Sequence, residues 1–314
     1  MNAIPERTTV MLPTEAMTIG SPIQMWDGSD TDTGLYAGVR DEEYHAMQGM
    51  CSATQLKMLR NGSPQHVAHW LKNTQETPAL RIGRAFHAKT LCEPTFGHNF
   101  TIAPSLDRRT KAGKEAYATF VAMVRPGQTM LTRVEADLVD DMAAAVRDNG
   151  LASDLLADCG EYEVTAFGEV NGVKCRAKMD ALDPQCSLLI DLKTTQTLAG
   201  RDEMQHVVWK HGYGLQMCFY RELMRANGCN PGAVMIIAVE KKPPFAVACY
   251  ELQHDLLDMH VPMMNRLIAE WQETIGSNNI RGWSEQVQAL SLPRYALDEL
   301  EIEAQMEEST GGAS

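Results

Sequence analysis

The fold is decided by the stretch EVTAFGEVNGVKCRAKMD at residues 163–180 and by LLIDLKT at residues 188–194. Around Asn171-Gly172 the hydrophobic pattern changes to a period of two, and Asn-Gly between two such runs is the strongest short-range signal for a β-hairpin. The second stretch is mostly apolar, as expected of a buried strand. The sequence therefore predicts three consecutive antiparallel strands, over 163–170, 173–180 and 188–194.

The register of the hairpin places two acidic residues opposite each other. A two-residue loop pairs Val170 with Val173, and counting outward from this pair brings Glu163 opposite Asp180. Opposed residues project from the same face of an antiparallel sheet. The expectation depends on the register, because a single β-bulge would rotate one carboxylate away from the other.

A second turn brings a third carboxylate to the same face. If residues 184–187 form a four-residue turn, Asp180 also lies opposite Asp191. Lys193 is two residues farther on and shares that face, while the alternate apolar residues point into the core. The sequence thus predicts three carboxylates side by side, with a lysine at their edge.

These carboxylates need compensation by a proton, a basic neighbour or a divalent cation, because opposed like charges destabilise a sheet. Carboxylate oxygens suit Mg²⁺ or Mn²⁺. The alternative is a solvated charge ladder, in which Lys174, Arg176 and Lys178 pair with the acidic residues. A metal site is favoured because Asp191 and Lys193 lie within an apolar run, where charges are costly unless they line a site.

Helical patterns flank these strands in the sequence. Caps and apolar periodicity predict helices near 53–60, 64–71, 78–91, 112–124, 133–149, 200–210, 214–226 and 254–275, and a later strand pair over 233–239 and 245–251. Gly150 is expected to follow the end of the helix 133–149. We therefore predict an α/β (α+β) fold, with a central mixed sheet of antiparallel hairpins flanked by helices. The expected organisation is an irregular arm over 1–40, one domain over 41–297 and a disordered acidic tail over 298–314.

The composition is that of an ordinary soluble globular protein, with 314 residues, 44% of them hydrophobic. No stretch approaches the roughly 20 apolar residues that cross a bilayer, and the first residues lack the apolar segment of a signal peptide. We therefore expect no membrane association and a cytoplasmic protein. The eight cysteines include no C-x-x-C pair, which argues against a zinc ribbon or an iron–sulfur cluster and favours free thiols.

The net charge of −13 argues at first against a nucleic-acid partner. The charge is unevenly distributed, however: residues 298–308 hold six acidic residues and no basic one, whereas residues 81–125 hold eight basic and three acidic residues. A local basic surface on an acidic protein can still hold phosphates, although a solvated helix face is the alternative.

Three motifs in the same order resemble the PD-(D/E)XK nuclease superfamily. Asp180 followed by Asp191-Leu192-Lys193 matches its defining pattern. The sequence GRAFH at 83–87 resembles the G-x-x-x-H motif of the RecB-like branch, and QMCFY at 216–220 resembles its Q-x-x-x-Y motif. The flanks CSATQL at 51–56, DRRTKAGK at 107–114 and IDLKTT at 190–195 resemble RecE-type and phage-lambda-type exonucleases. Taken singly, the histidine and the tyrosine of these motifs would be core residues; their joint order favours a site.

The resemblance implies a restriction-endonuclease-like core and a role for each matching residue. The metal ligands would be His87, Asp180, Asp191 and the carbonyl of Leu192. The catalytic set would be Asp180, Asp191, Lys193, Glu163, Gln216 and Tyr220, with Lys193 orienting or deprotonating the attacking water. The candidates for DNA contacts are Arg84, Arg108, Arg109, Lys111, Lys114 and Thr194.

The resemblance also implies an activity and partners. Such enzymes use Mg²⁺ or Mn²⁺, two per site in our expectation, and degrade linear double-stranded DNA from 5′ to 3′ as ring-shaped oligomers, with a trimer favoured and a tetramer as the alternative. They leave 3′ overhangs for a RecT/Bet-type annealing protein in recombination. Two rivals stay open. One is another nuclease of this fold, Cas4-like or an endonuclease; the other is an inactive DNA-binding relative.

Overall fold

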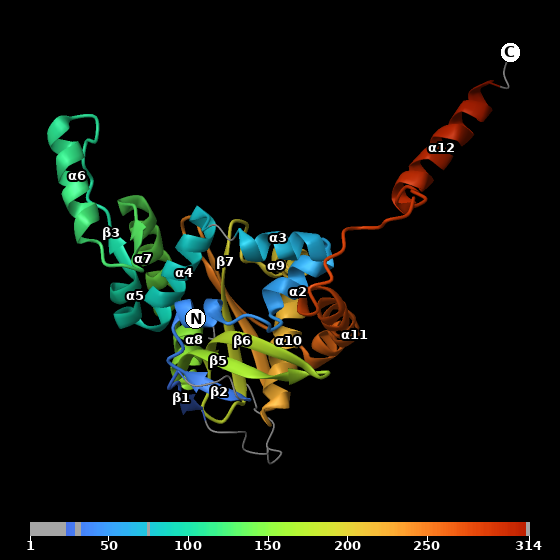
Figure 1. Cartoon of the computed structure of the whole chain (residues 1–314). Helices are drawn as coiled ribbons and strands as arrows, with labels where there is room; N and C mark the ends of the chain where they lie inside the picture. Colours follow the sequence, from blue (N-terminus) through green and yellow to red (C-terminus); the bar gives the residue numbers. More distant parts are fainter. Residues whose placement is uncertain (1–22, 29–32, 74–75, 312–314) are drawn as a thin grey trace, which may run out of the picture. The chain divides into compact units, whose positions relative to one another are not determined.

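The computed structural model describes residues 23–28, 33–73 and 76–311, and it contains two compact units, Met1–Ile280 and Arg281–Ser314. The first unit holds the sheets and helices α1 to α11 (Figure 1), and the second holds α12 (Arg294–Gly311). Within the described ranges, no helix is both long enough and apolar enough to cross a bilayer.

The central sheet has seven strands in the described part of the chain, in the order β1-β2-β5-β6-β7-β8-β9. The pairs β1–β2 and β7–β8 are parallel, and the other neighbours are antiparallel. In sheet order the strands are β1 (Gln24–Met25), β2 (Gly34–Ala37), β5 (Glu161–Val170), β6 (Val173–Leu182), β7 (Leu188–Thr195), β8 (Ala233–Glu240) and β9 (Val247–Glu251). A separate parallel pair consists of β3 (Phe100–Ile102) and β4 (Thr129–Leu131).

Helices cover both faces of the sheet, and each face has its own apolar core (Figure 1). One face packs against α2 (Ala53–Asn61), α10 (Tyr213–Ala226) and α11 (His254–Trp271). The other packs against α4 (Pro78–Leu91), α7 (Arg133–Asp148) and α8 (Gly150–Cys159). The remaining helices of this unit are α1 (Asp41–Ala46), α3 (Pro64–Lys72), α5 (Glu93–Asn99), α6 (Lys111–Met123), α9 (Arg201–Lys210) and the π-helical turn η1 (Gln272–Gly276). The expected α/β fold, with a mixed sheet flanked by helices, is confirmed.

Strand β7 is the central element of this arrangement. It pairs with β6 on one side and with β8 on the other, and both of its faces are buried. Leu189 contributes to the core under α10, whereas Ile190 and Leu192 contribute to the core under α4 and α7. This alternation explains the apolar run in the sequence and leaves Asp191 on the α10 side.

Both predicted registers are confirmed. Val170 pairs with Val173 next to the Asn-Gly turn, and the same count continues to the pair of Val164 and Met179. The second turn pairs Leu182 with Leu189, as a four-residue loop requires. The β5–β6 ladder is interrupted and the β6–β7 ladder ends next to the acidic positions, so neither Glu163 with Asp180 nor Asp180 with Asp191 forms a ladder pair.

Most expected helices are present within a few residues of their predicted ends, but α1, α5 and α8 were not predicted. Gly150 does not close the preceding helix; it is the first residue of α8, because the Asn149 side chain accepts a hydrogen bond from the Ala152 N–H at 3.0 Å and caps a new helix. The glycine was expected to end the preceding helix, but the asparagine before it starts a new one.

The ends of the chain differ from the expectation of irregular structure. Gly34–Ala37, expected to belong to an irregular arm, forms β2 and pairs with β5; residues 1–22 lie outside the described part. The acidic segment expected to be disordered from residue 298 belongs to α12. A run of strong helix formers and the Arg294–Asp298 ion pair at 2.8 Å, four residues apart, favour that helix.

The cap of α8 can be tested by mutation. We expect Asn149→Ala to lower the free energy of unfolding by about 1 kcal/mol, because the Ala152 N–H loses its acceptor. Asn149→Asp keeps an acceptor oxygen and should retain most of the stability. Urea unfolding followed by circular dichroism measures both; equal losses in the two variants would contradict the capping role.

Candidate metal and phosphodiester site

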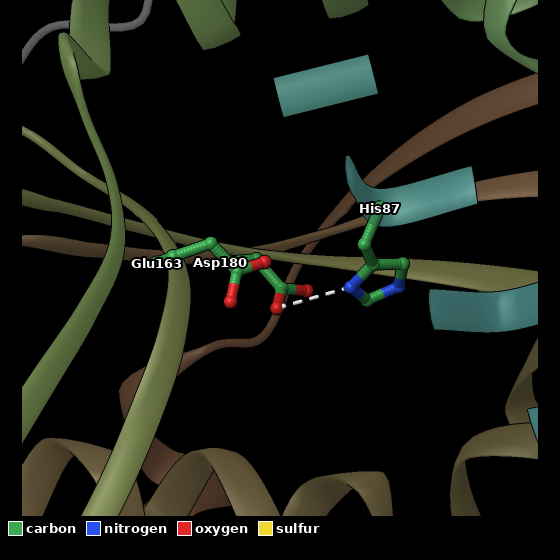
Figure 2. A group of neighbouring side chains, drawn as sticks. All are labelled: His87, Glu163 and Asp180. Carbon is green, nitrogen blue, oxygen red and sulfur yellow. Dashed lines mark ion pairs between the residues drawn. The ribbon is translucent and has the colours of Figure 1, made fainter. Parts of the chain in front are cut away.

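Three ligand-type side chains converge where β5, β6 and α4 meet. His87, Glu163 and Asp180 each offer one ligand atom, and these atoms all lie within 4.8 Å of one another. The Nδ1 atom of His87 is 3.2 Å from Oδ1 of Asp180. Figure 2 shows the two carboxylates beside each other, with the imidazole directed at Asp180. The structure thus brings together three of the predicted site residues, from α4, β5 and β6.

The two carboxylates lie at an irregularity in the sheet. Tyr162 and Ala181 pair on the α4 and α8 side, whereas Val164 and Met179, two positions away, pair on the α10 side. Regular alternation would put both pairs on one face, so the strands rotate between them. At that point Glu163 has a positive φ of 54° and no ladder partner among the pairs of β5 and β6. A distortion of this kind could have separated the two carboxylates, but in the structure their ligand atoms stay within 4.8 Å of each other.

The ladder between β6 and β7 ends at the same place. The pair of Ala181 and Ile190 is its last, and continuing the register would direct the Leu192 N–H to the backbone of Met179. Instead this N–H donates to Oδ2 of Asp180 at 2.7 Å. The Asp180 carboxylate thus replaces a backbone acceptor, which satisfies a buried donor and fixes the orientation of the carboxylate.

Asp191 lies on β7 and is held from the α10 side. Its Oδ1 accepts a hydrogen bond from Nε2 of Gln216 at 3.0 Å, and its Oδ2 forms an ion pair with Lys193. The same Gln216 amide also contacts the Tyr220 hydroxyl at 3.1 Å, one helical turn farther along α10. The residues of the Q-x-x-x-Y motif therefore meet the second acidic residue of the site.

Lys57 joins the site and was not predicted. From α2 its Nζ donates to Oε1 of Gln216 at 2.7 Å. Lys57 and Lys193 both approach the ring of Tyr213, at 5.7 and 5.0 Å from its centroid. Lys57 lies one helical turn after the buried Ala53, so a lysine on the inner face of an amphipathic helix was the signal that could have revealed it.

The charges of His87 and Asp180 stabilise each other. Burial disfavours the imidazolium, but the charge and hydrogen bond of Asp180 outweigh burial and raise the pKa of His87. Burial also disfavours the Asp180 carboxylate, yet His87, Lys193 and the Leu192 N–H together lower its pKa. Asp180 is therefore ionised in the neutral pH range.

The remaining acidic groups keep their protons more readily. Burial and the charge of Asp180 raise the pKa of Glu163 to about 7. Burial and Asp180 also raise the pKa of Asp191, although Lys193 opposes them. Burial and the neighbouring Lys193 lower the pKa of Lys57 to about 8. The site thus offsets its negative charge with retained protons and with basic neighbours, two of the three means that the sequence analysis named.

The donor set fits a divalent cation. One imidazole and two carboxylates lie within reach of one another, with His87 and Glu163 half-buried and Asp180 buried. The carboxylate oxygens suit Mg²⁺ or Mn²⁺, and the imidazole is a common ligand of divalent transition metals. His87, Glu163 and Asp180 would hold such an ion. Asp191 and the Leu192 carbonyl, expected from the sequence to be ligands, stay predictions, since Asp191 is engaged by Gln216 and Lys193.

The predicted DNA-contacting residues lie in three places. Arg84 is on α4, one turn before His87, and pairs with Glu76 at 2.5 Å. Thr194 follows Lys193 on β7. The basic residues at the start of α6 contact their own segment: Arg108 lies over Tyr117, Arg109 binds Asp107, and Lys111 approaches Glu115. These contacts do not join that segment to the carboxylates, and its role in binding DNA stays a prediction.

Comparison with known proteins identifies the fold. The family model described as a PDDEXK-like domain of unknown function matches residues 52–291. A protein from Eubacterium rectale described as a putative exonuclease superposes with a TM-score of 0.58 at 14% identity, over 83% of this chain and 97% of that one. A phage-related exonuclease from Haemophilus somnus matches 54% of this chain and 85% of its own at 16% identity, but its TM-score of 0.29 carries no weight. No curated protein matches significantly.

The raised pKa of Glu163 predicts a pH-dependent stability. Its value of about 7 in the folded protein, against an ordinary 4.5, means that the folded state keeps a proton which the unfolded chain releases between these pH values. Stability associated with this proton is fully present below pH 4.5 and is lost as the pH rises through 7. In EDTA, Glu163→Gln should therefore be more stable than the wild type at pH 8, by at most about 3 kcal/mol, and not at pH 5.

Urea unfolding at the two pH values measures this difference. Glu169→Gln is the matched control, because Glu169 lies on the same strand and is exposed. It should follow the wild type at both pH values. If Glu163→Gln does so as well, Glu163 does not share a proton-retaining cluster with Asp180.

Proposed function

Because the chain belongs to the PDDEXK-like domain family, we propose that it is a metal-dependent exonuclease acting on linear double-stranded DNA. The observation that carries the proposal is the convergence of His87, Glu163 and Asp180 beside the ion pair of Asp191 and Lys193. A merely structural charge ladder would not place an imidazole from another element on Asp180. It would also not bury Asp191 among apolar strands beside a half-buried lysine.

Each residue has a chemical task in this proposal. A divalent cation held by the site, one of two in our proposal, would supply Lewis-acid stabilisation of charge on the phosphate. Lys193 keeps its proton, because Asp191 and Asp180 raise its pKa against the effect of burial. Its ammonium therefore suits orientation of the attacking water and stabilisation of the phosphate oxygens. Gln216, anchored by Lys57, keeps Asp191 in place.

We further propose digestion from the 5′ end, leaving 3′ overhangs that a RecT/Bet-type annealing protein uses in recombination. The support for this is the sequence resemblance to RecE-type and phage-lambda-type exonucleases. A ring-shaped homo-oligomer, a trimer or a tetramer, is part of the same proposal. The overall charge of −13, together with a basic segment over residues 81–125, is compatible with a ring that is acidic outside and basic within.

Removal of the central residues should abolish the activity. We expect Lys193→Ala and Asp191→Ala each to lower the rate of digestion of linear duplex DNA in Mg²⁺ by at least about 100-fold, because each loses a charge that acts on the reacting groups. EDTA should stop the wild type as well. Release of acid-soluble nucleotides from labelled duplexes measures the rate.

Lys174→Ala is the matched control for these variants. Lys174 is an exposed lysine on the neighbouring strand β6, and its removal should leave the rate within about twofold of the wild type. If Lys193→Ala and Asp191→Ala digest DNA as fast as this control, the assignment of the site is wrong.

The requirement for an end, and its polarity, form a separate prediction. Linear duplexes labelled at the 5′ or the 3′ end should lose the 5′ label first, while covalently closed circles of the same sequence should stay intact. Gel electrophoresis of timed samples follows both substrates. Equal cutting of circles would replace the exonuclease by an endonuclease, and sedimentation velocity in the same buffer gives the number of subunits.

A further inference from the structure

A large aromatic side chain is exposed at the end of α9, on the side of the sheet where α2 lies. Trp209 is 60% exposed, although tryptophan is among the side chains most often covered in folded proteins. The guanidinium of Arg60, from α2, lies over its ring at 4.1 Å from the centroid. The same guanidinium donates from Nη1 to the Trp209 carbonyl at 2.9 Å. Arg60 therefore fixes the indole from two directions while more than half of the side chain faces solvent.

This pair is tied to the proposed catalytic site through α2. Lys57 and Arg60 are three residues apart and so occupy neighbouring positions on one helix face. Lys57 binds Gln216, which in turn binds Asp191. Helix α2 thus directs Lys57 to the proposed site and Arg60 to the exposed indole of Trp209.

The turn between α9 and α10 packs tightly against both cations. A Cβ at Gly212 would lie 3.1 Å from Cγ of Lys57 and 3.3 Å from Nη1 of Arg60. The positive φ of 65° at Gly212 also disfavours any other residue. The spacing between the exposed indole and the site is therefore set by a close contact of backbone and side chains.

Rings and cations alternate along this connection. After Trp209 and Arg60, the rings of His211 and Tyr213 stack at 5.6 Å with 24° between their planes. Lys193 then approaches the Tyr213 ring at 5.0 Å and reaches Asp191. We call this row the aromatic track; it consists of Trp209, Arg60, His211, Tyr213, Lys57 and Lys193.

We propose that the aromatic track binds a single-stranded segment of the DNA substrate next to the scissile phosphate, with one base stacked on Trp209. The proposal rests on the nuclease function proposed above and extends it. Proteins that hold single strands combine cations that follow the backbone with rings on which bases stack. Trp209 offers an exposed ring to a base, and the Arg60 guanidinium beside it supplies positive charge for the backbone phosphates.

The charges beside the indole favour a nucleic acid over a protein partner. A tryptophan at the centre of a protein interface normally lies in an apolar pocket from which charged residues are depleted. Here a guanidinium covers the ring, and Lys210 and His211 follow it in the sequence. The track also leads to the carboxylates, where a phosphodiester would react.

Binding and kinetics of Trp209→Ala test the proposal. Anisotropy of a fluorescein-labelled ten-nucleotide single strand, in Ca²⁺, should show about tenfold weaker binding, the loss expected for one stacked base. In Mg²⁺, the KM for duplex DNA should rise by a similar factor while kcat changes less than twofold. Trp209→Phe should restore much of the affinity, because phenylalanine keeps a stacking face.

Two further variants sharpen the test. Arg60→Ala should weaken binding as well, since the indole loses its support. Met259→Ala removes a side chain of α11 that is 78% exposed and should leave binding and KM unchanged. The proposal is overturned if Trp209→Ala binds the single strand as tightly as the wild type. It is also overturned if sedimentation shows that this variant loses DNA only because its subunits dissociate, which would make Trp209 a subunit contact.

The two proposals fail in different ways. A wild-type protein that binds the single strand through Trp209 but cleaves no duplex in Mg²⁺ or Mn²⁺ would contradict the nuclease function. It would still support DNA binding by the aromatic track. If Trp209→Ala cleaves duplex DNA with the same KM as the wild type, the nuclease function is supported and DNA binding by the aromatic track is contradicted.

Discussion

The structure depends on one constraint, the need to keep Asp180 charged within a sheet that carries two other carboxylates nearby. The paired residues of β6 and β7 end at Ala181 and Ile190. The next positions, Asp180 and Asp191, therefore do not pair across the ladder. The Leu192 N–H, left without a backbone acceptor, binds Asp180, and His87 approaches the other oxygen. Because the ladder ends here, the Leu192 N–H is free to donate the hydrogen bond that the buried Asp180 carboxylate requires.

The two acidic residues on either side of the break experience different environments. Asp180 faces α4 and the imidazole of His87, whereas Asp191 faces α10 and the ammonium of Lys193. Their pKa values move in opposite directions for this reason: neighbours lower that of Asp180, and burial beside Asp180 raises that of Asp191. Neighbouring carboxylates whose environments shift their pKa values in opposite directions are a frequent feature of functional sites.

How much could be predicted from sequence depended on the range of the interactions. The hairpin registers followed from local turn chemistry, and they placed Glu163 beside Asp180 correctly. The tertiary contact of Lys57 with Gln216 joins residues 159 positions apart, and no local pattern encodes the partner. The missed helix α8 is a different case, because its signal, the N-cap Asn149, is local. A glycine such as Gly150 more often follows the end of a helix, and this pattern favoured the wrong interpretation.

The net charge of −13 illustrates why a sum over the chain says little about a site. Much of the acidity lies in the segment 298–308, within a separate unit of the structure. Around Asp191, by contrast, two ammonium groups lie close to the carboxylates, since Lys57 and Lys193 converge on the ring of Tyr213. A phosphate responds to charges within about one Debye length, roughly 8 Å at physiological salt. The charges next to a bound phosphate therefore matter more than the net charge of the chain, and an acidic protein can still hold a site for DNA.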